Sequence, residues 1–145
     1  MVSAMDIVKG VCDALNECFD ITIYTEQVEQ GLKLPCFFVY CAKLSRERYR
    51  GRRYLAKNEL CIQYIPSDSA RMNDEISETL EKLYLCTEYI KADNGGAKIM
   101  LYGSKPRVEK GDGYTEFYIN YDMFYLIEDD TALMEELTVI NERSN

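Results

Sequence analysis

Apolar residues recur three and four positions apart in residues 4–18 and 67–90, with charged residues largely on the opposite side. This spacing is typical of amphipathic helices. The second stretch opens with Ser67, Asp68 and Ser69 as candidate N-caps, and acids crowd its first turns, as is common at helix starts. The pattern predicts two helices, with apolar faces formed by Ile7, Val8, Val11, Leu15 and Cys18 and by Met72, Ile76, Leu80, Leu83 and Tyr84.

Other stretches alternate with a period of two or are continuously apolar and β-branched, which predicts strands. In one of them the expected buried face is Tyr54, Ala56, Asn58, Leu60, Ile62 and Tyr64. The last two are separated by the glycine-containing turn 110–113, so we expect them to form a hairpin. In the final strand, the set from Thr115 through Phe117 and Ile119 to Ile127 is the expected core face. The predicted strands are 20–26, 36–44, 54–66, 98–109 and 114–128.

The expected order of elements is therefore α-β-β-β-α-β-β, followed by residues 128–145 as either a short helix or a tail that becomes ordered on a partner. This order predicts an α+β fold, an antiparallel or mixed β-sheet with two helices packed on one face. A chain of 145 residues with 47% apolar residues suits one ordered domain, which we place at residues 1–127. The chain has no apolar run long enough to span a bilayer and no secretory signal, so we expect it in the cytosol.

Charge is distributed unevenly along the chain. The net charge is −8, yet residues 46–57 hold six basic residues and one acid, a local charge of +5 against −13 elsewhere. Because this segment lies between two predicted strands, we expect a long antiparallel hairpin with Arg46–Arg53 at its tip. Three interpretations are open: a solvated loop, a nucleic-acid contact through arginine and tyrosine, or a contact with an acidic protein surface.

The acidity of the remaining chain opposes the broad positive field of a DNA-binding domain, and therefore favours the protein partner. An acidic body with a basic projection suits head-to-tail contact between copies, which closes into rings or extends into filaments. The candidate residues for contact with a neighbouring subunit or another protein are Arg46, Arg48, Tyr49, Arg50, Arg52, Arg53 and Tyr54.

The sequence contains little that indicates catalysis or metal binding. There is no histidine, and the six cysteines form no CxxC pair, which excludes the common zinc patterns and histidine-activated nucleophiles. We expect the cysteines to be reduced core residues. The acids Asp74, Glu75, Glu78 and Glu81 are interpreted as the solvated side of the second helix. No phosphate-binding glycine loop is present, so we predict no catalytic, cofactor or metal site and no enzymatic activity.

Four stretches carry a resemblance to a known family: TIYTEQVEQGLKLPCFFV (22–39), RYLAKNELCIQYIPSD (53–68), NDEISETLEKLYLCTEYI (73–90) and YTEFYINYDMFY (114–125). Together with the N-terminal helix, they make roughly residues 5–127 similar to the tail terminator family of prophages and phage-tail-like particles of Gram-positive bacteria. The motifs are structural and not catalytic. The resemblance does not specifically cover residues 128–145.

The resemblance implies a sheet with two helices on one side and a structural role without a cofactor. Such proteins assemble as a ring, usually six-fold, on the head-proximal end of the tail tube. The ring stops polymerisation of tube and sheath, and it offers a surface to the head-to-tail connector. The implied partners are thus other copies, the tube protein, the sheath and the connector, with no membrane and no specific nucleic acid. DNA passes through the ring.

The implied location is the bacterial host cytoplasm during assembly and the virion, or a phage-tail-like particle, afterwards. Two alternatives remain: another head-tail joining protein, such as a completion or stopper protein, and a nucleic-acid-binding regulator that uses the basic hairpin. An acidic body favours the structural role, because carboxylates repel the phosphates of DNA in a channel.

Overall fold

The computed structural model describes residues 2–26, 31–67 and 72–126. In these residues two helices, α1 (Ala4–Cys18) and α2 (Met72–Cys86), accompany eight strands. The start of α1 follows from a capping box, because Ser3 Oγ accepts from Asp6 N and Asp6 Oδ2 accepts from Ser3 N at 2.8 Å. These hydrogen bonds lower the pKa of Asp6. The bounds predicted for the first helix are confirmed.

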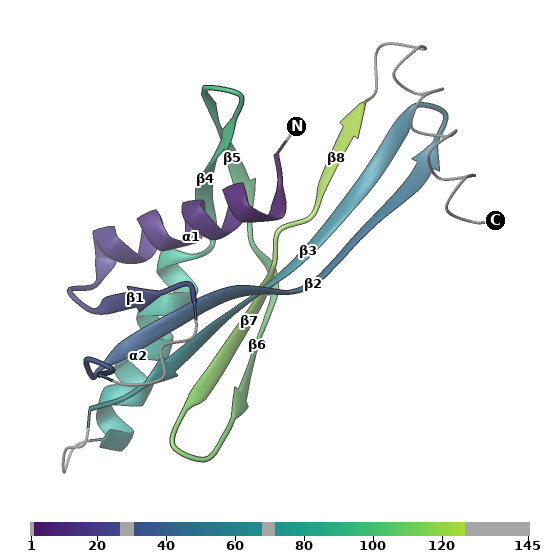
Figure 1. The fold of residues 1–145 in the computed structure, drawn as a ribbon. Coiled ribbons are helices and arrows are strands. Elements are labelled where there is room, and N and C mark those ends of the chain that lie inside the picture. The colour runs from purple at the N-terminus through teal and green to yellow at the C-terminus, as the bar shows by residue number, and fades with distance from the viewer. Residues whose placement is uncertain (1, 27–30, 68–71, 127–145) are drawn as a thin grey trace.

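Six strands form the main sheet, in the order β1-β2-β3-β7-β6, with β8 also paired to β3 (Figure 1). The short β1 runs parallel to β2 and the other pairs are antiparallel, so the sheet is mixed as expected. The strands of this sheet are β1 (Thr22–Tyr24), β2 (Cys36–Arg50), β3 (Arg53–Ile65), β6 (Ser104–Lys110), β7 (Thr115–Asn120) and β8 (Met123–Leu126).

The second helix ends earlier than predicted, at Cys86. At this end the Thr87 N–H and hydroxyl both donate to the Leu83 carbonyl oxygen, which completes the last helical turn, and the Thr87 carbonyl oxygen accepts from Tyr121 OH at 2.6 Å. The next residues form a separate hairpin of β4 (Tyr89–Asn94) and β5 (Ala97–Tyr102) around a turn at two glycines. The prediction of a helix up to residue 90 was therefore wrong, because apolar residues at helical spacing continue into β4.

The last two predicted strands are each divided in the structure. The predicted strand 98–109 breaks at Gly103, whose N–H donates to the Glu88 carbonyl, so its halves lie in different sheets. The predicted strand 114–128 breaks after Asn120, where Tyr121 N–H donates to the Asn58 carbonyl at 2.8 Å. The hairpin predicted around residues 110–113 is confirmed as β6–β7. The predicted helix or tail at 128–145 lies outside the described residues.

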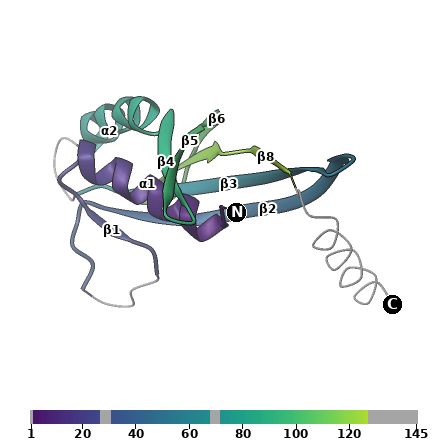
Figure 2. The same ribbon diagram turned by 90° about the horizontal axis from the view of Figure 1, so that it is seen from above.

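Both helices cover one face of the main sheet (Figure 2). Apolar residues of α1, Leu83 of α2 and inward residues of β2, β3 and β7 form one core, which also includes Ile90 and Leu101 of the small hairpin. The predicted α+β class is therefore confirmed. The predicted inner face of β3 is also confirmed: Tyr54, Ala56, Asn58, Leu60, Ile62 and Tyr64 are all buried.

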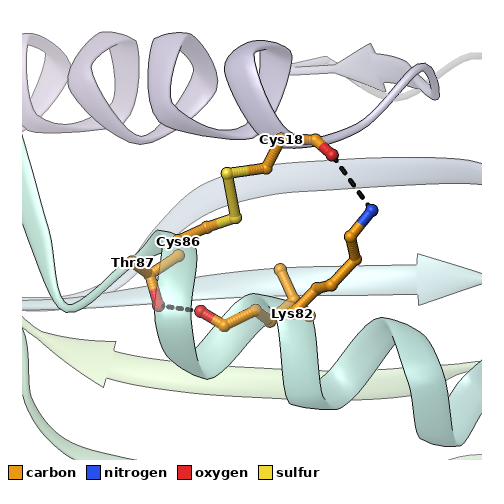
Figure 3. The surroundings of a disulfide bond; sticks show 5 residues. Cys18, Lys82, Cys86 and Thr87 are labelled. Carbon is orange, nitrogen blue, oxygen red and sulfur yellow. Dashed lines mark hydrogen bonds between the residues drawn. A yellow bond between two sulfur atoms is a disulfide. The ribbon is translucent and has the colours of Figure 1, made fainter.

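A disulfide joins Cys18, at the end of α1, to Cys86, at the end of α2, with a Cα–Cα distance of 6.5 Å (Figure 3). Beside it, Lys82 donates to the Cys18 carbonyl oxygen at 3.3 Å. Reduced core cysteines were therefore the wrong prediction for this pair, because both helices end at the rim of the core and bring the two thiols together. Cys36 and Cys61 are free and buried as predicted, while free Cys12 and Cys41 are partly buried.

Candidate functional site

The most prominent feature of the surface is the hairpin of β2 and β3, which extends well beyond the helix layer (Figure 1). We call residues 44–58 together with β8 the arm. Its strands stay paired to the end, from Leu44 opposite Asn58 to Arg50 opposite Arg53. The turn is formed by Gly51 and Arg52, and Gly51 has φ +58°, a conformation that glycine adopts without steric cost. The long antiparallel hairpin is as predicted, but its first strand continues to Arg50, beyond the predicted end at residue 44, so Arg46 and Arg48 lie within the paired strand.

A third strand supports the arm. β8 pairs with the outer part of β3, from Met123 opposite Ala56 to Leu126 opposite Arg53. Two aromatic contacts hold the strands together: the rings of Tyr54 and Tyr125 stack with centroids 5.5 Å apart, and Tyr49 meets Phe124 edge-on at 5.2 Å. The arm is therefore a three-stranded ribbon, which is stiffer than a free hairpin.

The predicted interface residues have different environments. Arg48 Nε donates to the Gly51 carbonyl at 2.7 Å, and Arg46 Nη1 donates to the Ser45 carbonyl at 2.9 Å, so these two side chains bond to the backbone of the arm itself. Tyr54 is 7% exposed and lies within the arm, whereas Tyr49 is 61% exposed. Arg50, Arg52 and Arg53 are exposed at the tip.

Arg50 and Arg53 face each other as register partners. Like charges directly opposite each other on neighbouring strands destabilise a hairpin. The pairing of Arg50 with Arg53 is therefore an electrostatically unfavourable feature of the arm, and an anionic group bound at the tip would relieve the repulsion.

A second polar surface lies on the sheet face away from the helices. There Glu116 Oε2 accepts from Tyr118 OH at 2.9 Å, from Tyr40 OH at 3.3 Å and from Cys61 Sγ at 3.5 Å. Tyr40, Cys61 and Tyr118 are aligned by strand register across β2, β3 and β7. Patterns within single strands do not reveal this network, since only the register between strands brings the residues together.

The protonation state of Cys61 argues against a nucleophilic role for this network. Burial raises the pKa of the Cys61 thiol to about 11. The thiol is therefore protonated at neutral pH, whereas nucleophilic chemistry requires the thiolate. The hydrogen bond with Cys61, followed by burial, raises the pKa of Tyr40, and burial raises that of Tyr118. At the edge of this face the Arg107 guanidinium lies 4.0 Å from the Tyr118 ring centroid and 3.5 Å from Glu59 Oε1. These contacts stabilise a sheet face that neither helix covers.

A comparison with known protein families shows where a chain with this arm and this uncovered sheet face belongs. A family model described as phage tail terminator protein matches residues 6–132. The chain belongs to the phage tail terminator family. The match covers α1 from Asp6 onward, α2 and the eight strands of the described residues, the arm included. A search of curated proteins finds no match.

The acidic residues that the sequence places on α2 form neither a catalytic site nor a metal site in the described part of the chain. No cluster of three or more metal-ligating side chains occurs within residues 2–26, 31–67 and 72–126. On α2, Asp74, Glu78 and Glu81 are exposed as expected. Glu75 differs from the prediction, because its carboxylate accepts from Tyr64 OH at 3.0 Å and from Ser67 Oγ at 2.8 Å. No helix in the described part of the chain is long and apolar enough to cross a membrane.

Proposed function

We propose that this protein caps the head-proximal end of a phage tail tube as a ring of identical subunits, six in number. The ring stops further polymerisation of the tube and offers a surface to the head-tail connector. Family membership assigns a structural role in tail assembly, and the ring and its position are our extension of that role. The observation that carries the proposal is a stiff basic arm on an acidic body.

A ring of identical subunits needs two different surfaces that fit each other, because only a head-to-tail contact that closes on itself gives a ring of more than two. The arm supplies one such surface. The other must be acidic, and exposed carboxylates on the helices provide a candidate at the far side of the subunit, where α1 carries Asp13 and Glu17 and α2 carries Glu78 and Glu81. Opposite charge steers the encounter and sets the register.

The arginine pair at the tip fits this arrangement. In a free subunit Arg50 and Arg53 face each other across the hairpin. Within a ring, carboxylates of the neighbouring subunit would replace that repulsion with charge-assisted hydrogen bonds. The same arginines could instead contact the end of the tail tube. If they contact a neighbouring subunit, purified subunits should associate on their own, whereas contact with the tube requires tube protein.

Light scattering of the purified protein at high concentration tests this proposal. We expect larger species at low salt than at high salt, because salt screens the attraction between exposed charges. The Debye length is already about 8 Å at physiological ionic strength and shortens as salt is added. Arg50→Glu with Arg53→Glu should lower the mass, and Lys33→Glu with Lys110→Glu, which changes the net charge equally outside the arm, should not. An arm variant with the wild-type mass would refute lateral contact through the arm.

A gel shift with duplex DNA separates this function from nucleic-acid binding through the same arginines. A terminator with a negatively charged body should show little retention at moderate salt, because −13 of charge outside the segment 46–57 repels phosphates. Tight, salt-dependent retention that is lost in the arm variant would instead support a regulator.

A further inference from the structure

The tip of the arm carries an apolar patch beside its arginines. Tyr49, Phe124 and Leu126 are 61%, 55% and 57% exposed. The register places Leu126 opposite Arg53, and Arg53 opposite Arg50. Residues two apart on β8 share a face, so Phe124 and Leu126 lie on the same side as Arg53. We call Tyr49, Arg50, Arg53, Phe124 and Leu126 the tip patch. A surface of this kind fits a partner that is both acidic and apolar.

We infer that the occupant of the tip patch in a free subunit is the acidic C-terminal segment, residues 127–145, of the same chain. This segment has six acids and one base, a net charge of −5 that matches the +5 of residues 46–57. Its apolar residues Leu133, Leu137 and Ile140 recur four and three positions apart, between the acidic pairs 129–130 and 135–136 and Glu142. The segment therefore offers both kinds of group that the patch requires.

The connection between the two favours binding within one chain. The last residue of β8, Leu126, pairs with Arg53 at the tip, so the acidic segment starts beside the patch. Tethering over such a short distance gives an effective concentration in the millimolar range, above that of free subunits. The segment neutralises the facing arginines while the subunit is alone, and a larger acidic and apolar surface replaces it during assembly.

The contact between the C-terminal segment and the tip patch does not depend on the proposed ring, because it forms within a single subunit. Hydrogen exchange of the full chain at low salt tests it. Amides of residues 128–142 should exchange about tenfold slower than in a random chain, as expected for a few weak charge pairs acting together. The slowing should shrink at high salt, and it should not grow with protein concentration.

Four variants make the test specific. Arg50→Glu with Arg53→Glu should return these amides to random-chain exchange, as should Glu135→Arg with Glu136→Arg, which leaves the arm unaltered. Combining both pairs should restore the slowing, and the control Lys33→Glu with Lys110→Glu should preserve it. Exchange in β2 and β3 shows whether the arm variant is folded. Random-chain exchange in the wild type, slowing that survives in the Glu135 and Glu136 variant, or slowing that grows with protein concentration would each overturn the inference.

Discussion

Replacing Gly10 in α1 with alanine has two opposing effects on stability, a gain in helix propensity and a loss in packing. Alanine is about 1 kcal/mol more favourable than glycine in a helix interior, so the sequence alone predicts stabilisation. In the structure, however, a Cβ at this position would lie 2.5 Å from the Lys91 carbonyl oxygen and 3.4 Å from Ile90 Cδ1. The obstacle is the backbone of β4, which cannot rotate away as a side chain can.

The two effects can be weighed against each other. Relief of the clash requires α1 and the β4–β5 hairpin to move apart, and overpacking of this kind costs about 1–3 kcal/mol. A contact with backbone belongs near the upper end of that range. After subtraction of the propensity gain, we expect Gly10→Ala to lower the free energy of unfolding by about 1–2 kcal/mol.

Urea denaturation followed by circular dichroism measures this difference. With a slope near 2 kcal/mol per molar urea, the midpoint should fall by about 0.5–1 M at unchanged slope. Asn16→Ala is the matched control, because Asn16 is exposed on the same helix and should gain stability through propensity alone. A midpoint for Gly10→Ala at or above the wild type would refute the close approach of α1 and β4.

Two further perturbations test other parts of the fold. Cys18→Ser with Cys86→Ser opens a loop of 68 residues, for which chain entropy predicts a loss of about 4 kcal/mol relative to the oxidised protein; reductant should mimic the variant, and equal urea midpoints would contradict the crosslink. Burial raises the pKa of Tyr64 to about 12, so its folded-state pKa exceeds the unfolded value. Its contribution to stability is then complete below pH 10 and declines as the pH rises to about 12. Tyr64→Phe should flatten this decline, which the exposed control Tyr102→Phe should leave unchanged.

Local patterns were sufficient to predict the parts of the fold that depend on near neighbours. The first helix follows from its apolar spacing and its Ser3–Asp6 capping box. The inner face of β3 follows from alternation, since a strand with one buried face must place every second residue in the core. The hairpin arm follows from two strands with a charged, glycine-containing connection between them.

Features that depend on contacts between distant residues could not be predicted in this way. Residues 87–90 continue the apolar spacing of α2, and only the pairing of β4 with β5, which begins with Tyr89 opposite Tyr102, shows that the helix has ended. The disulfide joins residues 68 positions apart, a pairing that no local pattern specifies.

The candidate site shows the same division. The arginines of the arm stand out from the sequence by charge alone. The facing of Arg50 and Arg53 depends on the irregular register between Arg48 and Arg50, which the composition does not contain. The exposed Phe124 and Leu126 join the site only because β8 pairs with the outer half of β3. The sequence predicts one strand over residues 114–128, whereas the structure divides it into β7 and β8.

The length distribution of tails made without this protein is the sharpest test of its role as a terminator. Negative-stain images of particles from a phage or prophage that lacks the gene should show tails of irregular or excessive length without attached heads, because nothing would stop polymerisation at the head-proximal end. Adding back the wild-type protein should restore a single length. Tails of normal length with heads attached, formed in the absence of this chain, would contradict its role as a terminator.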